Sequence, residues 1–263
     1  MSGKFSICAL FYGDSLFNAQ RCLASLKSAL ANPDEAACVQ DIRLALHIPS
    51  EEVSLCAIEA ARYFSKELKI KTIIYRPYGN VFKYPTMRKM FRDEENPLAD
   101  YVMWFDDDSY VTGSNPDFFR KAKEEVGVYP LIGQLWFLGV QGNQWEWFGT
   151  QPWFNKNLSK PRQMRFMQGA WWCMQRKVWE EYNWPWPELQ HNGGDSTLGE
   201  MCRHRNIGLG IWHDGVKINA DENGVESSSK RRGISQKEIG FSFNGEPLPV
   251  FHQYFEVSKE VYE

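Results

Sequence analysis

The chain has 263 residues, of which 43% are hydrophobic, and its 30 lysines and arginines stand against 33 aspartates and glutamates. This apolar content is enough for a sizeable core and excludes a disordered chain, while the net charge of −3 argues against a polybasic nucleic-acid binder. No run of about 18 apolar residues occurs, so we expect no membrane span. The opening residues 1–14 lack the features of a signal peptide, which favours a cytoplasmic location.

The first part of the chain alternates strand-like and helix-like patterns. The expected elements, in chain order, are strand 5–12, helix 16–30, strand 42–48, helix 51–68, strand 70–75, a short helix 84–92 and strand 101–105. This alternation predicts an α/β fold with a mostly parallel sheet and right-handed crossovers. Ligands bind beyond the carboxyl ends of such strands, so we expect one cleft there.

The second part is less regular. The expected elements are helix 116–128, strand 131–138, a long aromatic loop 139–163, strand 166–174, helix 176–182, helix 196–205 and strand 207–213. Residues 214–249 show little periodicity and predict a long, partly mobile loop. The six cysteines form no CxxC pair, so we expect buried free thiols and neither a zinc ribbon nor a disulfide framework.

Three aspartates, Asp106, Asp107 and Asp108, directly follow the apolar strand 101–105. Like charges held together at the mouth of a cleft favour a bound cation, and carboxylate oxygens select Mg²⁺ or Mn²⁺. If the strand continued, Asp106 and Asp108 would point the same way. A solvated acidic turn is the alternative interpretation, but the position after a buried strand favours a site for a metal and a diphosphate.

The apolar strand with its DxD motif resembles that of a GT-A fold nucleotide-sugar glycosyltransferase of the family 2 type. Two later segments resemble that family in the same order: 168–172 with 175–179, and 191–195 with 198–200. The resemblance covers about residues 5–215. It implies a GT-A fold, a mostly parallel Rossmann-like sheet flanked by helices, with a smaller sheet on the acceptor side. It also implies one catalytic domain over 1–263: a donor-binding half 1–112, an acceptor-binding and catalytic half 113–215, and a mobile loop and tail 216–263.

The same resemblance assigns the site residues. Asp108 would be the main metal ligand, with Asp106 holding the donor ribose or the metal, and His213 or His252 would complete the metal shell. Asp195 would be the general base of an inverting transfer; an N-cap of the following helix is its structural alternative, and Glu200 is the reserve base. The expected donor-contacting residues are Ala9, Phe11, Tyr12, Arg88, Lys89, Asp106, Asp107, Gly169, Ala170, Trp171, Arg231 and Arg232. The implied cofactors are Mn²⁺ or Mg²⁺ and a nucleotide-sugar donor, with a UDP-sugar favoured.

Nine of the 11 tryptophans lie between Trp136 and Trp186, which we interpret as a wall of the acceptor site. Aromatic faces suit sugars and nucleobases alike, so the acceptor stays open between a glycan and a hydroxymethylated base in DNA. Basic residues near these tryptophans favour DNA as the acceptor: Lys156, Lys160, Arg162, Arg165, Arg176 and Lys177. A DNA-modifying enzyme encoded by a phage would act in the host cytoplasm. Two other classes compete: a nucleotidyltransferase or hydrolase using the same aspartates, and a non-catalytic binding module.

Overall fold

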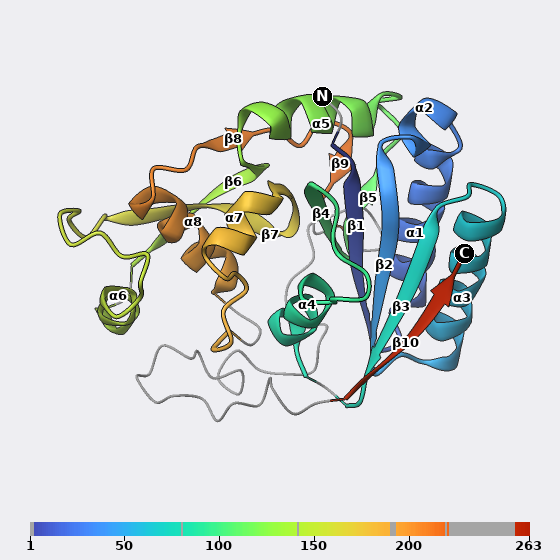
Figure 1. Cartoon of the computed structure of the whole chain (residues 1–263), viewed down its shortest axis with the longest axis horizontal. Coiled ribbons are helices and arrows are strands. Elements are labelled where there is room, and N and C mark those ends of the chain that lie inside the picture. Colours follow the sequence, from blue (N-terminus) through green and yellow to red (C-terminus); the bar gives the residue numbers. More distant parts are fainter. Residues whose placement is uncertain (1–2, 80, 141, 190–192, 219, 221–255) are drawn as a thin grey trace.

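One eight-stranded sheet runs through the whole molecule in this computed structural model, in the order β10-β3-β2-β1-β4-β7-β6-β8 (Figure 1). The structure describes residues 3–79, 81–140, 142–189, 193–218, 220 and 256–263. The strands are β1 (Phe5–Tyr12), β2 (Val39–His47), β3 (Lys71–Pro77), β4 (Tyr101–Asp106), β5 (Tyr110–Val111), β6 (Leu131–Gly139), β7 (Gln163–Gln175), β8 (Leu209–Ile211), β9 (Val216–Lys217) and β10 (Val257–Tyr262). The helices are α1 (Leu16–Leu30), α2 (Pro33–Ala36), α3 (Glu51–Lys66), α4 (Lys83–Phe91), α5 (Phe118–Val128), α6 (Gly142–Gly149), α7 (Arg176–Glu181) and α8 (Gly194–His204).

The middle of the sheet is buried on both faces, as the alternation of side chains along β1 shows. Ile7, Ala9 and Phe11 pack with α1, α3 and α5 on one face. Cys8 and Leu10 point to the other face, where α4, α7 and α8 close a second core. A strand buried on both sides reads as a continuous apolar run, which is how the sequence of β1 reads.

The expected α/β fold class is confirmed. Strands β3, β2, β1 and β4 are mutually parallel, and β8 is parallel to β6. Strand β7 joins β4 and β6 in antiparallel pairs, so the second half of the chain extends the same large sheet. Within the described residues, a second sheet consists of β5 and β9. None of the six cysteines forms a disulfide, as expected.

Several elements differ from the expected ones. Strand β7 begins at Gln163 rather than at residue 166, and helix α6 occupies part of the segment expected to be a loop. The C-terminal tail, in which no strand was expected, ends in β10, which pairs antiparallel with β3 at the edge of the sheet. Strand β10 escaped prediction because most of its side chains are exposed on both faces, so it has no hydrophobic alternation.

A buried ion pair fixes β2 to the loop after α4. The Arg43 guanidinium donates to Asp41 Oδ1 and Oδ2 at 3.0 and 3.2 Å, and to the backbone carbonyl oxygens of Met90 and Asn96. Arg43 is fully buried and Asp41 is 3% exposed. Removing the cation would therefore leave a buried carboxylate without its compensating charge.

We expect Arg43→Met to lower the free energy of unfolding by about 3–5 kcal/mol because Asp41 stays buried and charged. The matched control is Lys71→Met, which breaks the exposed pair between Lys71 and Glu263 and should cost less than about 1 kcal/mol. Urea unfolding of both variants at neutral pH measures the difference. Equal losses would contradict the account.

Candidate active site

The carboxyl ends of β1 and β4 lie side by side near the middle of the sheet. Their register places Leu10 opposite Asp106, the last residue of β4. The chain then turns, because the Ser109 N–H donates to the Asp106 carbonyl oxygen at 3.0 Å. The strand therefore ends at Asp106 and does not continue through Asp107 and Asp108. The expectation that Asp106 and Asp108 point the same way required a continuing strand, so it does not apply. All three aspartates are at most 8% exposed.

Asp106 is held by two neighbours. Its Oδ1 accepts a hydrogen bond from the Trp104 indole N–H, and its Oδ2 forms an ion pair with Lys83 Nζ, each at 2.8 Å. Lys83 Nζ also donates to the Gly169 carbonyl oxygen at 2.6 Å. Lys83, at the start of α4, thus joins the end of β4 to the middle of β7. Both Asp106 oxygens thus accept from described neighbours, Trp104 and Lys83.

Asp195 lies in the first turn of α8, beside Gly169. A Cβ added at Gly169 would come within 3.0 Å of Asp195 Oδ2. The helix cap is Gly193, with a left-handed φ of 79°, and Asp195 Oδ1 accepts from the Ser196 N–H at 2.8 Å. Asp195 is therefore not the N-cap, which was the alternative interpretation. As a whole residue, Asp195 is intermediate between buried and exposed.

Tyr84 closes the other side of Asp195. Gly194 packs so tightly on it that an added Cβ would lie 2.3 Å from the ring, which explains why α8 begins with glycine. Burial raises the pKa of the Asp195 carboxyl, the nearby Lys83 ammonium lowers it, and the net pKa lies above the usual range. Burial, and then the charges of Asp195 and Asp106, raise the pKa of Tyr84, so its phenol stays protonated. A carboxylate with a raised pKa is typical of a proton acceptor.

The expected donor-contacting residues of β1 are mostly core. Ala9 and Phe11 are at most 1% exposed and pack beneath α1 and α3, so their side chains do not face the cleft. Tyr12 is partly exposed and lies at the carboxyl end of the strand, two residues beyond the position opposite Asp106. Of the three, Tyr12 has the placement that stacking on a base requires.

The interpretation of the tryptophans as a binding wall is wrong for six of the nine. These six are at most 5% exposed and pack in the core: Trp153, Trp171, Trp172, Trp179, Trp184 and Trp186. Trp171 is buried against Phe105 and Trp212, and Ala170 is 2% exposed. Of the segment Gly169 to Trp171, only Gly169 is partly exposed at the cleft.

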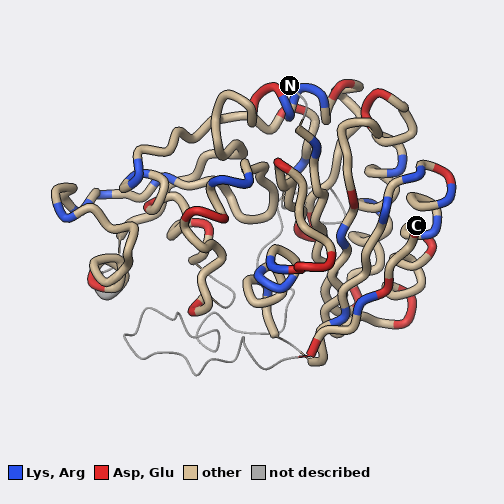
Figure 2. Tube along the Cα trace, viewed as in Figure 1, with Lys and Arg blue, Asp and Glu red and all other residues tan. Residues whose placement is uncertain are grey.

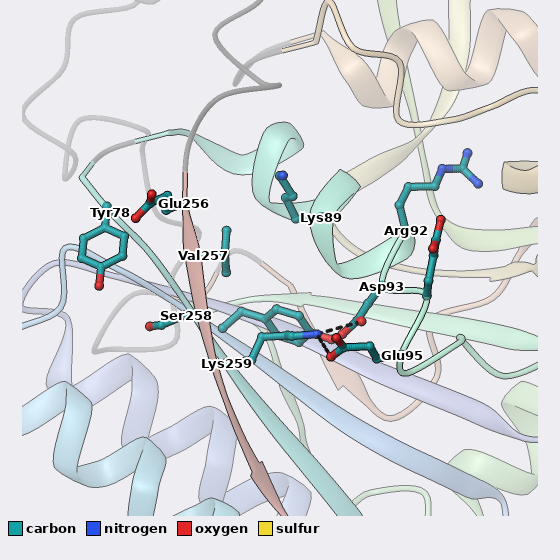
Figure 3. Close-up of a pocket in the computed structure, with 11 residues that line it drawn as sticks. Tyr78, Lys89, Arg92, Asp93, Glu95, Glu256, Val257, Ser258 and Lys259 are labelled. Atoms are coloured by element: carbon teal, nitrogen blue, oxygen red, sulfur yellow. Dashed lines mark hydrogen bonds and ion pairs between the residues drawn. The ribbon is translucent and has the colours of Figure 1, made fainter.

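Arg88 and Lys89 on α4 do not face the aspartates. The Arg88 guanidinium donates to backbone carbonyl oxygens of Asn183 and Pro185 and so holds the turn after α7. Lys89 lines a separate cavity of about 690 Å³ where α4 meets the edge of the sheet (Figure 3). There Lys259 Nζ bonds Asp93 and Glu95 at 3.0 and 2.6 Å and anchors β10. A role for Arg88 or Lys89 at a donor diphosphate is not supported.

The other expected residues lie elsewhere. His213 is exposed, and the antiparallel pairing of β9 with β5 takes it away from Asp108, whose carbonyl oxygen instead accepts from the Ala220 N–H. Glu200 is fully buried and paired with Arg203 at 2.8 Å, so it is structural and not a reserve base. Three expected residues fall outside the described part of the chain: Arg231, Arg232 and His252.

The donor set fits a metal that is shared with a substrate. Among the described residues no group of three His, Cys, Asp or Glu side chains is arranged to hold an ion. Mg²⁺ and Mn²⁺ do not need such a cage, since one or two carboxylates suffice when substrate phosphates and water complete the shell. Asp108 and Asp107, nearly buried at the end of β4, supply hard oxygen ligands of this kind.

Sequence reasoning missed the two residues that organise the site, Lys83 and Tyr84. They precede Pro85 at the start of α4, where they read as an ordinary helix beginning. The sequence did place a lysine and a tyrosine shortly before the DxD strand, in the segment that the resemblance links to the donor, and this position could have indicated a role in the site. Their function depends on Gly169 and Asp195, which are distant in sequence, so spacing alone could not reveal it.

This architecture occurs in solved nucleotide-sugar transferases. A mannosyltransferase from Pyrobaculum calidifontis, solved with GDP-Man and Mn²⁺, aligns over 81% of this chain and 56% of its own, at 8% identity and a TM-score of 0.50. GalNAc-T7, solved with UDP, GalNAc and Mn²⁺, aligns over 81% of this chain and 44% of its own, at 12% identity and a TM-score of 0.52. The fold is GT-A-like. At these identities the likeness shows the fold alone.

The chain spans only about half the length of these two GT-A-like structures. A nucleotidyltransferase-type synthase from Anaerococcus prevotii, 4-diphosphocytidyl-2C-methyl-D-erythritol synthase, covers 91% of this chain and 96% of its own, at 11% identity. Its TM-score of 0.47 is too low to support an inference. The sequence matches no known family profile and no curated protein. No helix among the described residues has the length and apolar character needed to cross a membrane.

Proposed function

We propose that this protein is a metal-dependent glycosyltransferase, which moves a sugar from a nucleotide-diphosphate sugar to a hydroxyl acceptor. One observation carries the proposal: Lys83 ties the carboxylate cluster after β4 to the Gly169 carbonyl, and Gly169 lies beside a second carboxylate, that of Asp195. The carboxylate cluster suits the binding of a cation and a diphosphate, and the Asp195 carboxylate suits the acceptance of a proton. A sugar transfer to a hydroxyl needs both functions side by side.

On the donor side, Asp108 and Asp107 would hold Mn²⁺ or Mg²⁺, and Tyr12 would stack on the base. When bound, the ion would neutralise charge on the departing diphosphate. Asp106 keeps Lys83 in place through its 2.8 Å ion pair, and this in turn fixes the Gly169 carbonyl. A UDP-sugar is the donor that we would test first, because the solved structure of GalNAc-T7 contains UDP.

On the acceptor side, Asp195 would remove the proton from the attacking hydroxyl. The oxygen then attacks the anomeric carbon from the face opposite the diphosphate, so the configuration inverts. Tyr84 and Gly169 restrict where the Asp195 carboxyl can lie. The acceptor is either a hydroxymethylated base in DNA or a glycan. A nucleotidyltransferase reaction at the same aspartates is the alternative chemistry.

We expect Lys83→Met to lower turnover and to change its pH dependence. The Lys83 charge lowers the pKa of Asp195, so without it that pKa rises further. The base is active only when ionised, and the acid limb of the turnover–pH profile should therefore move to higher pH. Lys83→Arg retains the charge and should move the limb less. A profile with lower turnover but an unmoved acid limb would contradict this role.

The test of the proposed function is transfer itself. The protein is incubated with a panel of nucleotide-sugars and Mn²⁺, with hydroxymethylcytosine DNA or a glycan array as acceptor. Digested nucleosides and released glycans are then analysed by mass spectrometry. A sugar mass increment on either acceptor supports the proposal and identifies the acceptor class. Turnover of no nucleotide-sugar in the panel would overturn it.

A further inference from the structure

We infer that a projecting arm, formed by residues 135–139 of β6, residues 163–167 of β7 and the loop 150–162, binds a nucleic-acid strand. The inference rests on the proposed function in one respect, because the bound strand would carry the acceptor hydroxyl. Strand β8 pairs with β6 only at Leu131–Gly133, so beyond Gly133 the outer edge of β6 has no strand partner in the described part of the chain. Figure 1 shows β6 and β7 extending beyond the helices at this end of the sheet.

The charge of this region is opposite to that of the chain. Residues 131–175 contain one acidic residue, Glu146, and four basic ones: Lys156, Lys160, Arg162 and Arg165. All four basic residues are exposed, and none forms an ion pair with a described residue. Basic residues lie at the free end of the arm, on the left in Figure 2. A cluster of exposed cations on a chain of net charge −3 suits a polyanion.

The same arm exposes large apolar side chains. Trp136 is 39% exposed and Phe137 is 51% exposed, in contrast to the buried tryptophans nearby. The Arg165 guanidinium lies over the Phe137 ring, 6.0 Å from its centroid. Trp136 and Phe137 are consecutive in β6 and point to opposite faces, so Phe137 shares its face with Arg165, its partner across the strands. An exposed ring beside a cation suits single-stranded nucleic acid, since a phosphate pairs with the cation and a base stacks on the ring.

A cavity of about 540 Å³ lies between the arm and α8. Arg165 and Arg203 line it together with apolar side chains that include Leu135 and Ile211. The cavity is of a size that admits a base or a sugar ring, and Arg165 connects it to the exposed ring of Phe137.

Helix α8 links the arm to the candidate active site. The Asn155 N–H donates to His204 Nδ1 at 2.8 Å, and Phe154 stacks on the His204 ring, so the loop is fixed to the end of the helix. Burial, with the neighbouring Arg203 charge, lowers the pKa of His204 to about 4, so its ring stays neutral and can accept this bond. Asp195 lies in the first turn of the same helix, about 13 Å along its axis.

The test is fluorescence anisotropy with a labelled single-stranded oligonucleotide and the duplex formed from it, over a salt titration. The arm variant is Arg162→Glu with Arg165→Glu. The control is Lys66→Glu with Lys121→Glu, two exposed lysines on α3 and α5 that receive the same charge change. We expect the arm variant to bind about tenfold or more weakly and its salt slope to fall by about 1.4, because each phosphate contact contributes about 0.7. The control should bind as wild type does.

Two further readouts separate the possible failures. Phe137→Ala should weaken binding about tenfold without changing the salt slope, since it removes stacking rather than charge. Hydrolysis of the nucleotide-sugar without acceptor should be unchanged in all of these variants. Nucleic-acid binding without any donor hydrolysis would leave the arm's role standing and would overturn the proposed function instead.

Three results would overturn the inference itself. The first is no binding of either oligonucleotide by the wild-type protein. The second is equal weakening by the arm variant and the control. The third is a dimer, detected by light scattering, that Trp136→Asp dissociates, because the free edge of β6 would then pair with a second copy.

Discussion

Replacing Asp108 by alanine should abolish sugar transfer and donor hydrolysis in the presence of Mn²⁺ while leaving the fold intact. Asp108 lies in the turn after β4 and is 8% exposed, and its neighbour Asp106 is already engaged by Trp104 and Lys83. Loss of Asp108 removes the carboxylate that the proposal assigns as the main ligand of the ion. We expect a decrease in turnover of about 10³-fold, the scale on which loss of a preorganised electrostatic contact acts.

The matched control for Asp108→Ala is Asp100→Ala. Asp100 precedes the opposite end of the same strand and is exposed, and its contact with Arg176 is 4.0 Å long. This control should keep wild-type turnover and melting temperature. Addition of EDTA to the wild-type protein should reproduce the effect of Asp108→Ala. Full activity in EDTA would contradict the assignment of a metal to this turn.

Replacing Asp195 by asparagine should lower turnover by about 10²-fold or more with little change in donor affinity, because the amide cannot accept the acceptor's proton. The product of the wild-type reaction should have the inverted anomeric configuration, which NMR of the product would measure. A retained configuration would rule out direct attack assisted by a base at Asp195.

The same substitution has a second expected effect, on stability. The folded-state pKa of Asp195 is raised, so above its unfolded pKa the ionised carboxylate destabilises the fold. Asparagine removes that cost, and the melting temperature of Asp195→Asn at neutral pH should equal or exceed that of the wild type. A lower melting temperature accompanying the loss of turnover would indicate a structural rather than a catalytic role.

The parts of the fold that could be predicted are those whose burial leaves a pattern. Strands β1 and β4 are buried on both faces and read as apolar runs, and helices α1 and α3 show the helical spacing of apolar residues. Strand β10 has mostly exposed side chains and was missed. Its position depends on backbone pairing with β3, which leaves no pattern in the sequence.

The site was predicted in part for a similar reason. The aspartates after β4 and Asp195 stand in local motifs, whereas Lys83 and Tyr84 matter only because the fold brings α4 against β7 and α8. The tryptophan cluster led to a wrong prediction because the composition of a segment cannot distinguish a buried core from an exposed binding surface. Trp171 and Trp184 are buried in the core, while Trp136 on the same stretch of chain is exposed.

In the proposed reaction this protein breaks the bond between a sugar and a nucleoside diphosphate at the aspartates that follow β4. Chromatography of the nucleotide products, after incubation of the wild-type protein with a nucleotide-sugar and Mn²⁺, shows which bond reacts. We expect nucleoside diphosphate, formed by the wild-type and Asp100→Ala proteins and not by Asp108→Ala. Nucleoside monophosphate, or nucleoside triphosphate formed when pyrophosphate is added, would show that a phosphoanhydride bond reacts instead and would contradict the proposed reaction.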